Sequence, residues 1–267
     1  MRILVCIKEI QDPEIAASVF RVDEQRKEVV PLAGLPLVTS PFDAQAVEAA
    51  LRIRDKGCQC QISVITLGPE DAKRAIKWAL SMGVDDGIHV SDSGIERGDS
   101  VLTAHVLSAA IRQLGQFDLI LTGRQAADWD AGIVGCGIAE LLRIPVVTFA
   151  MSVQVDGRRA VVERVLDDGF ETVEAPLPCV ITVSNELGEP RKASLRETMR
   201  AAKKPTLTRN LESIGMTPDS LAARARLQER TRLFVPAKNN KCELVTGDSA
   251  QAMAKQMVSR LTAAKLL

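Results

Sequence analysis

Short apolar runs alternate with amphipathic, helix-like segments over the first 150 residues of this 267-residue chain. A run that is apolar throughout is typical of a strand buried on both faces, and a helix between successive strands lets them lie parallel. The expected strands cover residues 3–7, 61–67, 87–90, 119–121 and 146–149. Because strand–helix–strand crossovers are right-handed, the pattern predicts an α/β fold with a doubly wound, mostly parallel sheet.

Residues with strong positional preferences mark the ends of the expected helices. Ser40 as N-cap, Pro41 in the first turn and Asp43 three residues after the cap predict a helix start. Gly57 marks the end of that helix, and Asp130 is positioned to cap a later one. The remaining expected helices cover residues 68–83, 99–114 and 130–142.

The periodicity changes after residue 150. Residues 152–155 and 159–166, joined by an Asp-Gly turn, predict an antiparallel hairpin within an added region at 151–184. Residues 191–232 are rich in charge and poor in apolar periodicity, which predicts irregular structure. A last helix is expected over residues 249–266, with an apolar face made by Met253, Met257, Leu261 and Ala264. We expect it to pack on a partner subunit; the alternative is that it folds back on its own domain.

Charge and composition argue against several classes of protein. The 34 basic residues balance the 34 acidic ones, whereas nucleic-acid binding relies on an excess of basic charge. No apolar run reaches the roughly 18 residues that a membrane span needs. The opening segment MRILVCIKEI predicts a strand and not a signal peptide. Six cysteines without a CxxC pair, and only two histidines, predict reduced thiols in a cytoplasmic protein and no metal site.

The segment 121–135, LTGRQAADWDAGIVG, leaves an expected strand and enters an expected helix. Ligands of open α/β sheets bind at such carboxyl ends of strands. Gly123 permits a close approach of the backbone to a ligand, and the N–H groups at a helix start form an anion site. The motifs GxGxxG, GxxxxGK(S/T), GxSxG and HExxH are absent. From these residues alone, an adenine-nucleotide phosphate and an ordinary capped loop remain equally open.

One further segment, residues 161–182 (VVERVLDDGFETVEAPLPCVIT), carries an ordered pattern. By local rules alone it is a two-stranded excursion on the α/β core that turns at Gly169. Its residue order resembles the pattern typical of the β subunit of electron-transfer flavoproteins. The matching residues are Val162, Arg164, Asp167, Asp168, Gly169, Glu171, Val173, Pro178, Val180, Ile181 and Thr182. The resemblance extends from residues 3–8 to residues 201–204 and implies a Rossmann-like, adenine-nucleotide-binding fold.

The resemblance implies that the segment 121–135 and the neighbouring strand ends bind AMP. The residues implied for the nucleotide are Cys6, Ser40, Pro41, Phe42, Asp43, Leu67, Gly123, Arg124, Gln125, Ala126, Ala127, Asp128, Trp129, Asp130, Ala131, Gly132, Ile133 and Val134. The chain departs from the family at Trp129, Ala131 and Ile133, so backbone N–H groups would carry more of the phosphate binding. Some family members bind a second FAD in place of AMP and split electron pairs from NADH. The Trp129 indole would either stack on such a ring or narrow the cavity to AMP; we favour AMP.

The resemblance also implies partners. FAD would be held mainly by an α subunit, with Asp12 and Pro13 of this chain on one wall of the flavin pocket. Leu195 matches the leucine that docks into a pocket on an acyl-CoA dehydrogenase. Electrons would then pass to a quinone oxidoreductase or another acceptor. The charges that flank Leu195 are expected to be solvated: Arg191, Lys192, Lys203 and Lys204.

The expected organisation is a nucleotide-binding domain over residues 1–190, a partner-recognition loop over 191–204, and an extended arm with the C-terminal helix over 205–267. Such a chain would carry electrons in a heterodimer and would not itself transform an organic substrate. Two alternatives remain. One is an electron-bifurcating β subunit with two FADs that oxidises NADH, and the other is a homodimeric nucleotide-binding regulator without flavin.

Overall fold

The computed structural model describes the chain except for residues 33, 92–98, 218–220, 222–229 and 237–241. The chain divides into two compact units. The first comprises Met1–Phe20 and Val30–Thr231, and the second comprises Arg21–Val29 and Arg232–Leu267. The buried core of parallel strands and helices lies in the first unit.

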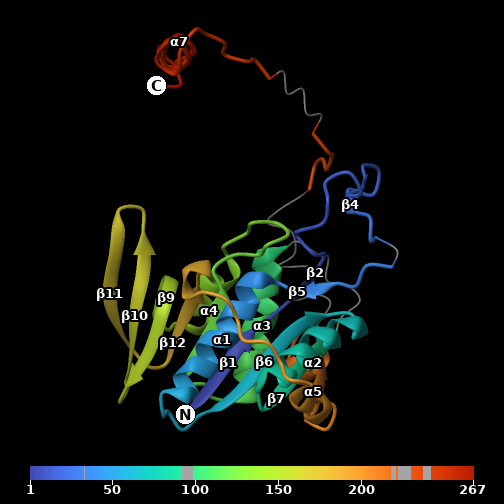
Figure 1. Ribbon diagram of the computed structural model, residues 1–267. Coiled ribbons are helices and arrows are strands. Elements are labelled where there is room, and N and C mark those ends of the chain that lie inside the picture. The colour runs from blue at the N-terminus through green and yellow to red at the C-terminus, as the bar shows by residue number, and fades with distance from the viewer. Residues whose placement is uncertain (33, 92–98, 218–220, 222–229, 237–241) are drawn as a thin grey trace. The chain divides into compact units, whose positions relative to one another are not determined.

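A nine-stranded sheet, counted over the described residues, forms the centre of the first unit (Figure 1). The strand order is β11-β10-β9-β12-β8-β1-β6-β7-β13. The bounds are β1 (Arg2–Cys6), β6 (Gln61–Gly68), β7 (Asp86–Ser91), β8 (Leu119–Gly123), β9 (Val146–Asp156), β10 (Arg159–Leu166), β11 (Gly169–Pro176), β12 (Cys179–Val183) and β13 (Thr206–Asn210). Neighbours from β9 through β13 are parallel, whereas β10 pairs antiparallel with both β9 and β11. The predicted mostly parallel sheet with an added hairpin is confirmed.

Helices cover both faces of this sheet because each strand alternates its side chains between two cores. In β1, Ile3 and Val5 enter one buried cluster, and Leu4 enters the other. Helices α1 (Pro41–Asp55) and α2 (Lys73–Met82) pack in the first cluster. Helices α3 (Ser100–Leu114) and α4 (Val134–Leu142) pack in the second. The sheet is therefore doubly wound, as predicted.

Four local predictions differ from the structure. The two strands expected within 146–155 are one continuous strand, β9, whose pairing with β10 and β12 shifts register. Helix α4 begins at Val134 and not at 130. Asp130 does not cap it, since it has φ of +50° and its Oδ1 accepts a hydrogen bond from Gln125 Nε2 at 2.9 Å. Ser40 precedes α1, but its hydroxyl makes no capping hydrogen bond.

The segment expected to be irregular contributes a helix and an edge strand. Helix α5 (Leu195–Ala201) packs on α2, and β13 extends the sheet beyond β7. The arm was expected to begin at residue 205, but residues Thr206–Asn210 pair with β7 and belong to the sheet. Leu207 is the one large apolar residue of β13, and four of the five residues are exposed, so no apolar pattern marked this strand. The short elements of the first unit are β2 (Glu9–Ile10), β5 (Val38–Thr39), η1 (Glu70–Ala72), η2 (Asn185–Leu187) and η3 (Glu212–Ile214).

The second unit contains a small hairpin and the C-terminal helix. Strands β3 (Val22–Asp23) and β4 (Glu28–Val29) pair antiparallel. Helix α7 (Ala250–Ala263) is capped by Ser249, whose hydroxyl accepts a hydrogen bond from the Ala252 N–H at 3.1 Å. The predicted final helix is thus confirmed, and none of its residues is buried. Among the described helices, none has the length and apolar character to cross a bilayer.

Candidate functional site

The predicted nucleotide residues gather at the carboxyl ends of β1 and β8, which are neighbours in the sheet. After β1 the chain leads to α1 on one face, and after β8 it leads to α4 on the opposite face. Chains that diverge in this way leave a crevice at the strand ends, where open α/β sheets bind ligands. Cys6 ends β1, Gly123 ends β8, and Leu67 lies near the end of the adjacent β6.

Asp43 joins the two sides of this crevice. Its Oδ2 accepts a hydrogen bond from the Lys8 N–H at 2.9 Å, and its Oδ1 accepts one from the Gly123 N–H at 3.2 Å. Burial raises the pKa of Asp43 to about 7, although these N–H groups and the Lys8 charge act in the opposite direction. Both oxygens are thus engaged with the backbone, and Asp43 organises the crevice through the ends of β1 and β8.

Lys8 closes the crevice from the side of β1. Its Nζ lies 2.8 Å from Oδ1 and 2.9 Å from Oδ2 of Asp128, in the loop between β8 and α4. The sequence analysis identified Asp128 but missed Lys8. The available signal was its position two residues past the end of β1, since such positions line ligand crevices. Cys6 lies beneath, where burial and the neighbouring Asp43 charge raise the pKa of its thiol. It is therefore a neutral thiol.

Gly123 is required by the start of α1. A Cβ added at this position would lie 2.6 Å from Asp43 Oδ1 and 2.7 Å from Phe42 Cβ. The close approach predicted for Gly123 is therefore made to this chain's own helix. Gly135 has a similar role in α4, because a Cβ there would lie 2.6 Å from Thr122 Oγ1 and 2.8 Å from Thr182 Cγ2. Both glycines let helices start close to the strand ends.

The loop from 124 to 133 is folded on itself. The Asp130 N–H donates to the Ala126 carbonyl at 2.7 Å, and the Ala126 N–H donates to the Ala131 carbonyl at 3.2 Å. The Trp129 ring lies 4.4 Å from the guanidinium carbon of Arg230. This cation–π contact occupies one face of the indole that the sequence offered for stacking on a ligand. Gly132 and Ile133 are exposed in the same loop, and Gln125, Ala127 and Val134 are half-buried.

The residues present fit a nucleotide because several buried polar atoms have no hydrogen-bond partner among the described residues. The hydroxyls of Ser40 and Thr66 and the Nε of Arg124 are buried without a hydrogen-bond partner among the described residues. Buried polar groups in native proteins are nearly always hydrogen-bonded. Ser40 directly precedes α1, and Thr66 lies near the carboxyl end of β6, the strand beside β1. Free hydroxyls on these elements suit the hydroxyl and phosphate groups of an adenine nucleotide.

Arg124 turns away from the loop toward β9 and β12. Its guanidinium carbon lies 5.1 Å from the ring centre of Phe42 and 5.6 Å from that of Phe149. Its Nη1 donates to Ser184 Oγ at 3.0 Å, and that hydroxyl donates in turn to the Glu186 carboxylate. The hydrogen bond from Ser184 lowers the pKa of Glu186. Arg124 is thus held between two aromatic rings beside the crevice.

Phe149 was not among the predicted site residues, yet two residues of the pattern at 161–182, Arg164 and Thr182, hold the backbone around it. Phe149 has φ of +59°, which costs a bulky residue about 1–2 kcal/mol. Its N–H donates to Thr182 Oγ1 at 3.1 Å. Arg164 donates to the adjacent Thr148 through Nε to the carbonyl at 3.1 Å and through Nη2 to Oγ1 at 3.0 Å. Arg164 and Thr182 therefore fix the backbone irregularity in β9 that turns Phe149 toward Arg124.

The other predicted contact residues lie outside the crevice. Leu195 is 79% exposed at the start of α5. Asp12 and Pro13 are exposed, and Asp12 Oδ1 accepts a hydrogen bond from the Glu14 N–H at 2.9 Å within a turn. In the part of the chain that the structure describes, neither Leu195 nor the Asp12–Pro13 turn makes a hydrogen bond to the predicted nucleotide residues.

Two of the charges beside Leu195 are not solvated as expected. Arg191 Nε lies 2.8 Å from Glu48 Oε2 on α1, and its Nη2 lies 2.6 Å from Asp55 Oδ2. Lys204 Nζ donates to the Leu80 carbonyl at the end of α2 at 3.0 Å. These contacts attach both ends of the segment that carries α5 to the helices beneath it, so Leu195 is presented on a fixed support.

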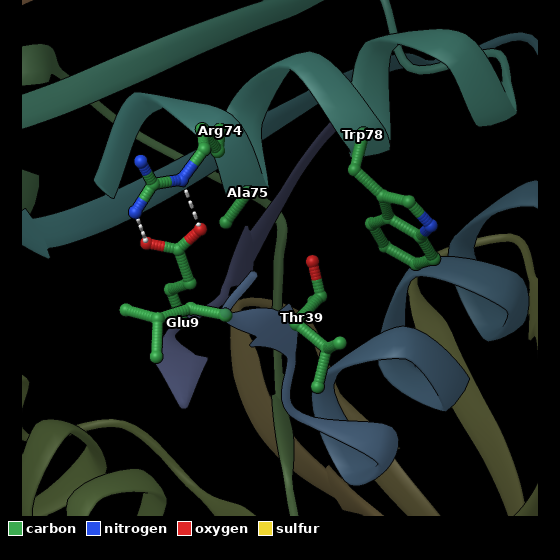
Figure 2. Close-up of a pocket in the computed structure, with 7 residues that line it drawn as sticks. Glu9, Thr39, Arg74, Ala75 and Trp78 are labelled. Carbon is green, nitrogen blue, oxygen red and sulfur yellow. Dashed lines mark hydrogen bonds and ion pairs between the residues drawn. The ribbon is translucent and has the colours of Figure 1, made fainter. Parts of the chain in front are cut away.

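A surface pocket of about 270 Å³ lies between α2 and the β2–β5 pair (Figure 2). In it, Arg74 makes a two-point ion pair with Glu9, at 2.9 and 3.2 Å, while Trp78 forms a separate wall. The charges of Glu9 and Arg74 satisfy each other. None of the predicted nucleotide residues lines this pocket, so it is distinct from the crevice.

The chain is similar to known proteins over nearly its whole length. The family model for the electron transfer flavoprotein domain matches residues 32–213. The chain is 34% identical over 261 residues to the "Caffeyl-CoA reductase-Etf complex subunit CarD" of Acetobacterium woodii, with 98% of each chain covered. It is 31% identical over 275 residues to the "Electron transfer flavoprotein subunit beta" of Megasphaera elsdenii, with 100% of each covered. It is 34% identical over 221 residues to the "Acryloyl-CoA reductase electron transfer subunit gamma" of Anaerotignum propionicum, with 82% of this chain and 80% of the relative covered. The chain belongs to the family of electron transfer flavoprotein β subunits.

Proposed function

We propose that this chain is the β subunit of a heterodimeric electron carrier that serves a CoA-ester dehydrogenase or reductase in the cytoplasm. The observation that carries the proposal is the match over 98% of the chain to a subunit of a reductase–Etf complex. A second relative named as an electron transfer subunit of an acryloyl-CoA reductase supports the same class of partner. Electrons would pass between this partner and a quinone oxidoreductase or another acceptor.

Within the heterodimer, the crevice of this chain binds AMP. The unpartnered hydroxyls of Ser40 and Thr66 would hydrogen-bond the nucleotide, and Arg124 would supply positive charge. Asp43 would keep β1, β8 and α1 in register around it. The Lys8–Asp128 ion pair and the contact of Arg230 with the Trp129 indole support a ligand of AMP size, since both occupy space beside the crevice.

FAD, bound with the α subunit, supplies the electron-carrying ring. This chain would complete one wall of the flavin pocket and exclude water from it. The apolar face of α7 would pack on the α subunit, because its residue Met257 is 48% exposed and the neighbouring Val258 is 54% exposed. In this role the chain is a carrier subunit and transforms no organic substrate by itself.

A second candidate is an electron-bifurcating β subunit with FAD in the crevice in place of AMP. The observation that favours it is that two relatives are named for CoA-ester reductases, so electrons would flow toward the CoA ester. A low-potential reductant such as NADH would then have to supply them. The number of flavins in the heterodimer separates the two candidates.

The docking role of Leu195 gives the test of the proposed function. Loss of one leucine side chain that is buried in the complex costs about 1.5–3 kcal/mol. Leu195→Ala should therefore lower kcat/KM for electron transfer between the bound FAD and the CoA-ester partner about tenfold or more. Flavin content should stay at the wild-type level. Leu166→Ala, at another partly exposed leucine, is the matched control and should leave the rate unchanged. Equal rates for wild type and Leu195→Ala would reject the docking site.

A further inference from the structure

Phe149 is held in an unfavourable backbone conformation at the irregularity of β9. The residue has φ of +59°, and its side chain is 41% exposed. Two contacts from different strands, Arg164 to Thr148 and Thr182 to the Phe149 N–H, fix this conformation. A strained residue that its surroundings hold from several sides is a sign of function. In this conformation the Phe149 ring contacts the Arg124 guanidinium.

Arg124 has more hydrogen-bonding capacity than the described residues use. Its guanidinium carries five N–H donors, and one of them, on Nη1, donates to Ser184 Oγ. Nε is buried without a partner in the described part of the chain. Two aromatic rings contact the guanidinium, and rings attract a cation through their faces while its N–H edges stay free to donate. Phe42 and Phe149 therefore fix the orientation of a cation whose edge is unsatisfied.

The charges around Arg124 leave it available for an anion. Glu186 is the nearby carboxylate, and it is hydrogen-bonded to Ser184. Arg124 follows Gly123 directly, so it sits beside the crevice, and its side chain reaches Phe42 in the first turn of α1. A fixed cation in this place suits a negatively charged group of a bound cofactor.

We propose that Phe149 is a positioning residue that holds the Arg124 guanidinium toward the negative charge of a bound cofactor. This proposal rests on the proposed function. The shared chemistry is an anionic oxygen or ring that accepts N–H donors, and it has two possible sources: the phosphate of the nucleotide in the crevice, or the reduced, anionic ring of the FAD that the α subunit holds. The ring of Phe149 acts through Arg124 and does not itself need to contact the cofactor.

The test uses the full-length heterodimer with four variants: Arg124→Gln, Phe149→Leu, Phe149→Tyr and their matched control Phe170→Leu. Phe170 is 67% exposed at the start of β11, and the described rings that contact Arg124 are those of Phe42 and Phe149. The phosphate source is measured by calorimetric titration of nucleotide-stripped protein with AMP and with adenosine. The flavin source is measured as the midpoint potential of the bound FAD.

If the phosphate is the source, Arg124→Gln should weaken AMP binding about tenfold and change adenosine binding less than about twofold. If the flavin is the source, the same variant should make the midpoint potential more negative, because a fixed cation favours the reduced ring. Phe149→Leu should move the same readout in the same direction, by about threefold in affinity or a smaller potential shift. Phe149→Tyr keeps the ring and should restore the wild-type value.

Combined with Arg124→Gln, Phe149→Leu should add nothing, because it acts through the lost cation. The proposal is overturned if Phe149→Leu leaves both readouts at wild-type values, or if AMP and adenosine weaken equally with no potential shift, or if Phe170→Leu has the same effect. A wild-type heterodimer that binds neither AMP nor FAD would overturn the proposed function and this inference together. Normal cofactor binding with an inert Phe149→Leu would overturn the inference alone.

Discussion

The two compact units of this chain place their apolar side chains differently. In the first unit, β12 is buried along its whole length and β1 is buried at four of five positions. In the second unit, α7 carries a row of apolar residues, and none of its side chains is buried. A sheet covered on both faces is stabilised within its own chain, whereas an apolar helix face without cover is typical of an interface. The comparison predicts opposite responses to mutation.

The largest effect is expected on the apolar face of α7. Met257→Asp combined with Leu261→Asp should weaken association with the α subunit by more than about a hundredfold, since two buried apolar side chains contribute about 3–6 kcal/mol. The thermal midpoint of the isolated chain should hardly change. Sedimentation or calorimetric titration with the α subunit measures the first effect, and calorimetric melting the second.

Lys255→Asp is the control for this pair, because Lys255 is exposed and lies on the opposite side of α7 by helical periodicity. It should leave association within about twofold of wild type, a change of less than about 0.5 kcal/mol. Unchanged association of the double variant would show that α7 is not the interface, and the contrast between the two units would then fail.

A smaller effect, of the opposite kind, is expected at the crevice. Gly123→Ala should lower the free energy of unfolding by about 2–3 kcal/mol, because its methyl would overlap Asp43 Oδ1 and Phe42 Cβ. Chemical denaturation measures this change. Gly132→Ala in the same region meets only the Arg124 carbonyl, at 3.3 Å, and should cost less than half as much. Equal stability of both variants would mean that α1 does not pack against β8 as tightly as described.

The smallest effect concerns the pH dependence of Asp43. Its pKa is raised from 3.8 to about 7 by burial, so the folded chain keeps a proton that the unfolded chain has released between those values. Rising pH across this window should therefore lower the free energy of unfolding. We expect a fall of at least about 1 kcal/mol between pH 4 and 7, because one unit of pKa difference between the folded and unfolded chain corresponds to about 1.4 kcal/mol.

Asp43→Asn does not titrate and should lack this component of the pH dependence. The difference in unfolding free energy between wild type and variant, measured from pH 4 to 8, isolates it from Cys6, Lys8 and Asp128 nearby. A difference that is flat across this range would contradict the raised pKa.

The sequence predicted the frame of the crevice because that frame depends on local signals. Apolar runs define β1 and β8, and Pro41 after Ser40 defines the start of α1. Contacts between residues far apart in the chain could not be predicted in this way. Lys8 and Asp128 are 120 positions apart in the chain, and Arg191 and Glu48 are 143 positions apart. Which side chains meet there is decided by tertiary packing.

The same limit explains the pattern at residues 161–182. The sequence presented Arg164 and Thr182 as members of an ordered motif, but their common partner is the Thr148–Phe149 step of β9, outside the motif. The irregularity of β9 was hidden because residues on both sides of it favour strands. Similarly, the four charges around Leu195 gave no sign that Arg191 and Lys204 are fixed to α1 and α2 while Lys192 and Lys203 are exposed.

The most direct measurement is a count of the nucleotides and flavins in the heterodimer formed with the α subunit, after acid release and chromatography. We expect one AMP and one FAD per heterodimer, with AMP retained in the crevice at the carboxyl ends of β1 and β8. Loss of AMP from Gly123→Ala, but not FAD, would locate it there. Two FADs and no AMP would contradict the proposed carrier and establish the bifurcating candidate, and the absence of both would contradict a nucleotide site in this crevice.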